Sequence, residues 1–171
     1  MFKGGAGPEF EMSTIEPSRP INARVGPGAH VGVTEVMIHE LVHTFYGKIR
    51  TDPALGHIFN RVIGDNWDTH LGRMCDFWSS VLLMTGRFKG APMIAHARIP
   101  EIRPTHFARW LHLFRQTAEQ VCPPDAAALF VAKSEMIAES LQLWIATSRG
   151  QLPIASKTPT ETGAGIGKET A

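Results

Sequence analysis

Apolar side chains recur at three- and four-residue steps from about residue 34 to residue 150, which is the spacing of one face of an α-helix. The most pronounced stretch reads WDTHLGRMCDFWSSVLLMTG and begins at residue 67. Its apolar face comprises Trp67, His70, Met74, Phe77, Val81 and Met84, widened by Leu71, Trp78 and Leu82. The pattern predicts one helix from residue 67 to about residue 86, with a face broader and more aromatic than a small bundle requires.

Three other stretches carry the same helical spacing. The first begins near Thr34 and ends before Pro53, with Tyr46 expected at the rim of its apolar face, ring inward. The second opens at Pro104, and the third follows Asp125. The expected inward positions are Met37, Ile38, Leu41, Val42, Phe45 and Ile49 in the first, Phe107, Trp110, Leu111, Phe114, Ala118 and Val121 in the second, and Leu129, Met136, Ile137, Leu141 and Trp144 in the third.

The segments between these helices are short and interrupted. Residues 54–64 can form one or two helical turns, and residues 87–103 are broken by Gly90, Pro92 and Pro100, so His96 falls on a single short turn. No pair of strands is evident, and the predicted fold class is all-α. We expect a flexible leader at 1–32, partly left over from cloning, one domain at 33–150 and a disordered tail at 151–171.

Composition and charge narrow the function classes. The chain has 171 residues, 43% of them hydrophobic, and 17 basic residues against 16 acidic ones for a net charge of +1. That balance leaves no excess of positive charge of the kind that binds nucleic acid. No apolar run approaches the ~18 residues of a membrane span. Its two cysteines, Cys75 and Cys122, form no CxxC pair, so we expect a reduced, cytoplasmic protein.

The candidate chemistry is a set of polar groups around one apolar space. His70 lies within the aromatic face, His96 follows on the short turn, and Tyr46 and Trp110 come from neighbouring helices. Each alone has a plain explanation as a core, rim or surface residue, and His106 and His112 rival His96 as a ligand, although His112 should face solvent. Together they suggest a buried flat ligand that carries a metal, because buried donors without partners cost about 1–3 kcal/mol each.

One motif competes with that interpretation. His39, Glu40 and His43 match HExxH, the helix that holds zinc in many metalloproteases. The extended motif requires a glycine and a third histidine, but those positions hold Tyr46 and Ile49, and no glutamate follows before Glu101. Both histidines fall on the polar side of their helix, which favours a solvated face over a zinc site.

The chain resembles the group III truncated haemoglobins from about residue 36 to residue 149. The matching residues occur in order: DPxLGxIFN, HxxxMxxFWSSVLL, GxP followed by a histidine, and FxxWLxLF. The resemblance implies a two-over-two helical sandwich around haem b (iron protoporphyrin IX), with a shortened proximal segment. The short, proline-broken stretch around His96 agrees with that feature.

The resemblance also implies roles for individual residues. His96 would be the proximal iron ligand, and Tyr46, His70 and Trp110, with Met74, would form the distal pocket. Phe59, Phe77, Trp78 and Phe107 would line the haem. Family members often carry lysine where this chain has Ala95, so we expect Arg98 or Arg103 to anchor a propionate instead.

These expectations favour a haem protein that reversibly binds or carries small ligands such as O2, NO, CO or cyanide. The alternatives are a haem enzyme with NO dioxygenase or peroxidase-like activity, which would need a reductase partner as electron donor, and a helical interaction domain without a cofactor. The sequence contains no flavin or nicotinamide motif to supply electrons.

Overall fold

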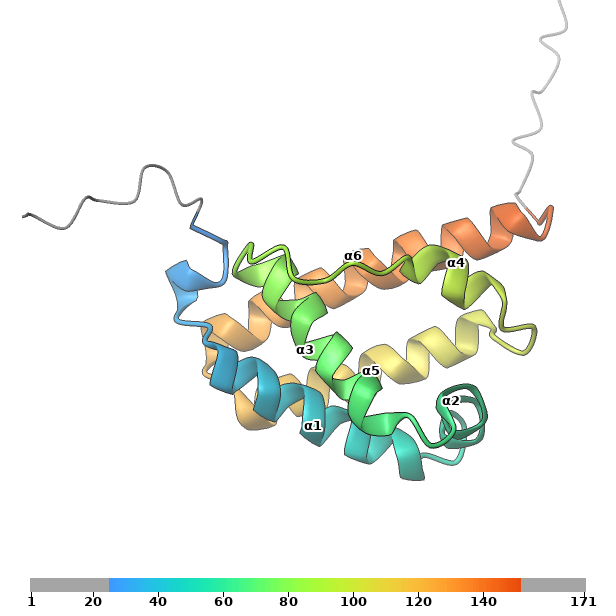
Figure 1. The fold of residues 1–171 in the computed structure, drawn as a ribbon, viewed down its shortest axis with the longest axis horizontal. Coiled ribbons are helices and arrows are strands. Elements are labelled where there is room, and N and C mark those ends of the chain that lie inside the picture. The colour runs from blue at the N-terminus through green and yellow to red at the C-terminus, as the bar shows by residue number, and fades with distance from the viewer. Residues whose placement is uncertain (1–24, 152–171) are drawn as a thin grey trace, which may run out of the picture.

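The computed structural model describes residues 25–151, and all the regular secondary structure in this part of the chain is helical. The elements in order are η1 (Ala29–Val31), α1 (Glu35–Thr51), α2 (Gly56–Ile63), α3 (Trp67–Leu82), α4 (Pro92–Ala97), α5 (Pro104–Val121) and α6 (Pro124–Ser148). The predicted all-α class is confirmed (Figure 1). Most of the predicted leader and nearly all of the predicted tail lie outside the described residues, so the predicted domain boundaries stay predictions.

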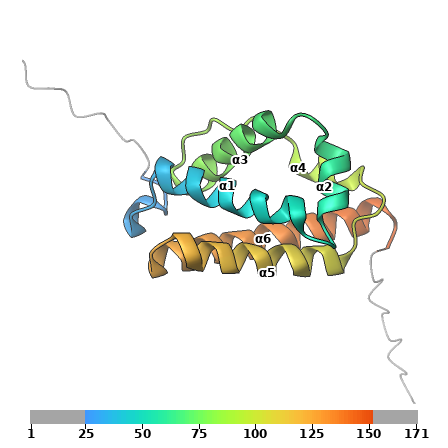
Figure 2. The same ribbon diagram turned by 90° about the horizontal axis from the view of Figure 1, so that it is seen from below.

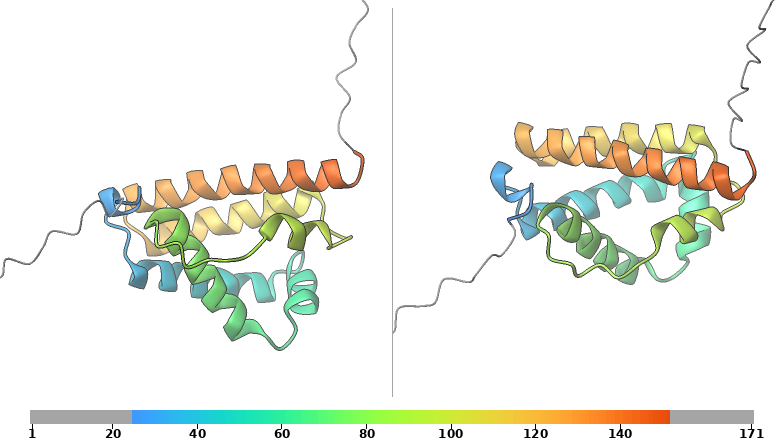
Figure 3. Two further views of the ribbon diagram at one scale, coloured as in Figure 1. Left: turned by 45° about the horizontal axis from the view of Figure 1, so that its top comes forward. Right: turned by 90° about the horizontal axis from the view of Figure 1, so that it is seen from above.

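Four helices form two layers, with α1 and α3 in one layer and α5 and α6 in the other (Figure 2). α1 also packs against α5 across the layers, and the short α4 packs against α6. The turned views show α6 running the length of the molecule with α5 beside it (Figure 3). This arrangement is the predicted two-over-two helical sandwich, and it leaves the short helices α2 and α4 at the edge of a space between the layers.

Local chemistry sets the ends of α1. The N-cap Thr34 accepts a hydrogen bond from the Met37 N–H (3.2 Å), and the chain leaves the helix at Asp52. The buried Asp52 carboxylate accepts hydrogen bonds from the N–H groups of Ala54 and Leu55 (both 3.0 Å) and from the Arg109 guanidinium (2.7 Å). The corner between α1 and α2 is thereby tied to α5.

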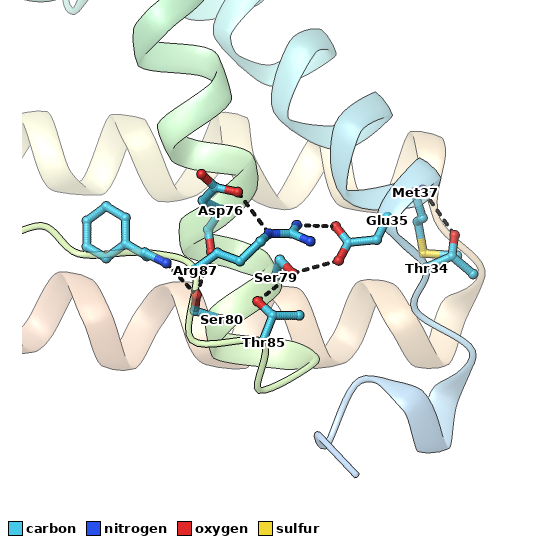
Figure 4. Close-up of polar contacts among 9 residues, drawn as sticks. Thr34, Glu35, Met37, Asp76, Ser79, Ser80, Thr85 and Arg87 are labelled. Atoms are coloured by element: carbon cyan, nitrogen blue, oxygen red, sulfur yellow. Dashed lines mark hydrogen bonds and ion pairs between the residues drawn. The ribbon is translucent and has the colours of Figure 1, made fainter. Parts of the chain in front are cut away.

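α3 is shorter than predicted, ending at Leu82 rather than near residue 86. Met84 is 47% exposed and takes a left-handed φ of 58°, which turns the chain out of the helix. Arg87, just beyond the turn, lies between Asp76 of α3 (2.9 Å) and Glu35 of α1 (2.8 Å) (Figure 4). Met84 therefore does not belong to the apolar face of α3.

The buried face of α6 also differs from prediction. Leu141 is buried, but Met136 and Trp144 are 59% and 47% exposed. The residues that face the core are mostly smaller: Ala126, Ala127, Phe130, Val131, Ser134, Ala138, Leu141 and Ile145. Close packing of α6 on α5 favours small side chains at the contact. The largest apolar residues therefore did not indicate which face of α6 is buried.

The core forms two clusters. The larger joins α1, α3, α5 and the first half of α6, and the smaller gathers Phe107, Ala138, Leu141 and Ile145 beneath α4. Over residues 25–151, no helix has the length and hydrophobicity that crossing a bilayer would demand.

Candidate functional site

A largely apolar cavity opens between the two layers, beside α2, α3 and α4. The space inside it, counted out to its open mouth, is about 940 Å³. Its walls combine residues from every α-helix: Tyr46, Leu55, Ile58, Phe59, His70, Met74, Phe77, Trp78, Phe88, Pro92, His96, Ile102, His106, Phe107, Trp110, Ile137, Ala138 and Leu141. The structure thus brings together all the site residues expected from the sequence except the two propionate candidates, Arg98 and Arg103, which are exposed and do not line the cavity.

His96 enters the cavity from α4, the short helix that begins at Pro92. Its Nδ1 lies 2.7 Å from the carbonyl oxygen of Pro92, one turn earlier. A carbonyl can only accept, so Nδ1 carries the proton and donates it. The Nε2 lone pair is then left available for a metal, which is the tautomer of a metal-binding histidine whose orientation is held by the backbone.

The link that follows His96 is held by arginines. Arg149, at the C-cap of α6, donates to the carbonyl oxygens of Ile99 (2.8 Å) and Ile102 (3.0 Å). Arg103 donates from Nη1 to the carbonyl oxygens of Pro100 (2.6 Å) and Ile102 (3.1 Å). These contacts satisfy carbonyls that have no helical partner, and they fix the loop between α4 and α5.

Tyr46 is buried rather than at the rim, so the predicted rim position is wrong although the ring does point inward. It is 6% exposed, because Phe59, Trp67 and His70 cover it from α2 and α3. Its ring meets the His70 ring edge-on at 5.0 Å. Burial raises the pKa of the Tyr46 hydroxyl above its usual value, so it keeps its proton at neutral pH and remains a donor.

His70 has an unsatisfied polar atom. Its Nε2 is buried without a hydrogen-bond partner, the one such side-chain nitrogen or oxygen among the residues that the structure describes. Burial, followed by the charges of His96 and Arg73, lowers the pKa of His70 to about 4, so the ring is neutral at pH 7. An orphaned buried group costs about 1–3 kcal/mol, so this nitrogen is available to a group bound in the cavity.

Trp110 is positioned by aromatic packing. Its ring stacks on Phe114 (centroids 5.1 Å apart, planes at 11°) and meets Phe45 edge-on at 5.2 Å. These rings form an aromatic lattice that continues from Phe114 to Trp78, which is 3% exposed. The side of the cavity that carries Tyr46, His70 and Trp110 is therefore rigid.

Phe88 is a wall residue that sequence reasoning missed. It belongs to the link between α3 and α4, its ring meets Phe77 edge-on at 5.1 Å, and its N–H donates to the Ser80 hydroxyl (2.9 Å). A Cβ at Gly90 would clash with the Phe88 ring, so the glycine permits this close approach. The link shows no helical pattern, and only the glycine two residues after an aromatic could have signalled the contact.

His106 and His112, the rivals of His96, have different surroundings. His106 lines the cavity, but its Nδ1 accepts a hydrogen bond from the Arg103 N–H (3.2 Å) at the start of α5. His112 is exposed, as predicted. The HExxH histidines, His39 and His43, are also exposed and lie outside the cavity, and no group of three or more metal-ligating side chains occurs between residues 25 and 151.

Comparison with known proteins gives two informative matches, although no family model matches the chain. Group 3 truncated hemoglobin ctb from Campylobacter jejuni is 31% identical over 113 residues, which are 64% of this chain and 89% of that protein. The crystal structure of group III truncated hemoglobin from Campylobacter jejuni superimposes with a TM-score of 0.64 at 30% identity, covering 66% of this chain and 91% of that one.

Proposed function

The chain belongs to the group III truncated haemoglobins, and from this membership we propose that it is a haem b protein that reversibly binds O2, NO, CO or cyanide. His96 is the proposed iron ligand. Tyr46, His70 and Trp110, with Met74, form the proposed distal pocket.

The observation that carries this proposal is the tautomer of His96. Because Nδ1 donates to the Pro92 carbonyl, Nε2 is the nitrogen left to coordinate a metal. Of the two rivals, His106 already accepts a hydrogen bond at Nδ1 and His112 lies outside the cavity.

The cavity suits a flat macrocycle. Phe59, Phe77, Trp78 and Phe107 supply apolar walls, and His70 has a buried nitrogen in need of a partner. Haem bound there would supply an iron with one position open to a diatomic molecule. The chain has no CxxCH motif for covalent attachment, which favours haem b over haem c.

The distal donors act on the bound small molecule. The protonated Tyr46 hydroxyl and the Trp110 indole N–H can each donate to a polar ligand, and His70 can donate or accept because its ring is neutral. Arg98 is our candidate for a propionate, since the Arg103 guanidinium already donates to two carbonyl oxygens.

Optical spectra of the ferric, ferrous and CO forms test the proposal directly. We expect a Soret band in the wild type and its loss or displacement in His96→Gly, with partial recovery when imidazole is added. His106→Gly is the matched control, because it removes the other imidazole near the proximal wall and should leave the spectra unchanged. A wild-type spectrum retained in His96→Gly would contradict the assignment of the ligand.

A second candidate function rests on His70. A neutral imidazole buried beside the ligand site can accept a proton from peroxide, which is a requirement of peroxidase-like turnover. NO dioxygenation would also fit the pocket, but it needs an electron donor, and a reductase partner stays a prediction. Multiple turnovers with peroxide or NO, rather than reversible binding alone, would favour the enzyme.

A further inference from the structure

Two histidines lie together on the outer face of α1, away from the haem pocket. His39 and His43 are one helical turn apart and both are exposed. Their rings stack, with centroids 3.9 Å apart and planes inclined at 23°. They are the two histidines of the HExxH motif, and neither lines the cavity.

The separation of the rings suits shared coordination. Imidazole nitrogens bind zinc and similar ions at about 2.0–2.1 Å, so two nitrogens on one ion lie at most ~4 Å apart. The 3.9 Å separates the ring centroids, and because the rings stack, their in-plane lone pairs do not converge as they lie. Both side chains are exposed, so the rings can rotate until one nitrogen of each faces a common ion, as histidines one helical turn apart do in zinc-binding helices. Imidazole is a preferred ligand of Cu²⁺, Ni²⁺ and Zn²⁺.

The surroundings of the pair leave room for an ion. Gly47, the next position on the same face of α1, would meet nothing within 4 Å if it carried a Cβ, so the approach to His43 is open. Glu35, the preceding position on that face, is held by Arg87 (2.8 Å) and Ser79 (2.7 Å). The pair therefore offers two nitrogen donors, with water filling the remaining positions.

We propose that His39 and His43 form a surface site for a divalent transition-metal ion, separate from the haem pocket and tightest for Cu²⁺. The preference for Cu²⁺ follows from the general order of affinity, in which Cu²⁺ exceeds Ni²⁺ and Zn²⁺ for nitrogen ligands. With only two protein donors, this site lacks the third protein ligand that a zinc protease supplies.

The test is titration calorimetry of the full, haem-loaded chain without an affinity tag, using Cu²⁺ and then Ni²⁺. We expect one site in the wild type, and a loss of affinity of about a hundredfold in either His39→Asn or His43→Asn, because each leaves one imidazole where two acted together. His57→Asn and His112→Asn are the matched controls, since each removes an exposed histidine outside the pair. They should bind Cu²⁺ as the wild type does.

A rescue variant separates chelation from any general effect of the substitutions. Adding Gly47→His to His39→Asn places a new imidazole one turn after His43, where there is open space. We expect this double variant to regain most of the lost affinity. Equal Cu²⁺ binding by the wild type and the single variants, equal loss in the controls, or a failed rescue would each overturn the proposal. An unchanged Soret band throughout would show that haem binding is unaffected, so the two proposals fail or stand independently.

Discussion

The two walls of the pocket are built in different ways. The distal wall rests on the larger core cluster, where Phe45, Phe114 and Leu82 are at most 1% exposed and aromatic rings interlock around Trp110. The proximal wall is the six-residue α4, which contains no buried residue and is held by hydrogen bonds to backbone carbonyls. The proposed donors to the small ligand are therefore positioned by packing, and His96, the proposed iron ligand, is positioned by polar contacts.

This contrast assigns different tasks to the two sides. Packed aromatic rings move little, which suits groups that must meet a ligand of two atoms at a defined distance. A short helix with few apolar contacts opens locally at low cost, which suits the side where a large cofactor has to enter. The three predictions below test the contrast in order of expected effect.

The largest effect should come from the centre of the distal lattice. Phe45 contacts Tyr46, Trp110 and Phe114, so Phe45→Ala should lower the free energy of unfolding by about 3–5 kcal/mol. Met93→Ala, on the half-buried side of α4, should cost about 1 kcal/mol. Urea unfolding followed by circular dichroism measures both, and similar losses would refute the contrast between the walls.

An intermediate effect is expected at the distal donors. Tyr46→Phe and Trp110→Phe each remove one hydrogen bond to the ligand while leaving most of the packing in place. Such bonds to charge-bearing groups contribute about 1.5–3 kcal/mol, so O2 release should accelerate roughly ten- to hundredfold in flow experiments. The exposed Trp144 offers a control, and Trp144→Phe should release O2 at the wild-type rate. Unchanged release in both pocket variants would remove the donor role.

The smallest effect on stability should come from the proximal side. Arg149→Met removes one hydrogen-bond donor from each of the carbonyls of Ile99 and Ile102, so we expect a loss of about 1 kcal/mol in unfolding free energy. Transfer of haem to an excess of a haem-free acceptor should nevertheless quicken, because the loop after His96 is less well held. Arg115→Met, which breaks only an exposed ion pair with Glu135, is the matched control. If both variants transferred haem at the same rate, Arg149 would have no specific role in retaining haem.

Much of the fold followed from local pattern. The N-cap at Thr34, the break before Pro53 and the start of α5 at Pro104 were predicted correctly, since each depends on a residue whose backbone preference is strong. Nearly all the expected site residues also line one cavity, because they lay on apolar helical faces or on the one proline-bounded turn.

Features that depend on distant partners were not predictable. α3 ends early because Met84 turns the chain and Arg87 is held by Glu35, 52 positions away. Met136 and Trp144 of α6 were expected inside, but the contact with α5 favours smaller residues such as Ala138. In both places tertiary contacts decide between local conformations that the sequence alone leaves similar in energy.

The arrangement around Arg87 gives one end of the pocket a dependence on its medium. This arginine and Phe88 are neighbours, so the ion pairs to Glu35 and Asp76 also restrain the aromatic ring that closes the cavity there. Both ion pairs are exposed, so dissolved salt screens them, whereas it does not screen the packing of the aromatic rings around Trp110. A higher ionic strength should therefore loosen the Phe88 end of the cavity more than the wall around Trp110.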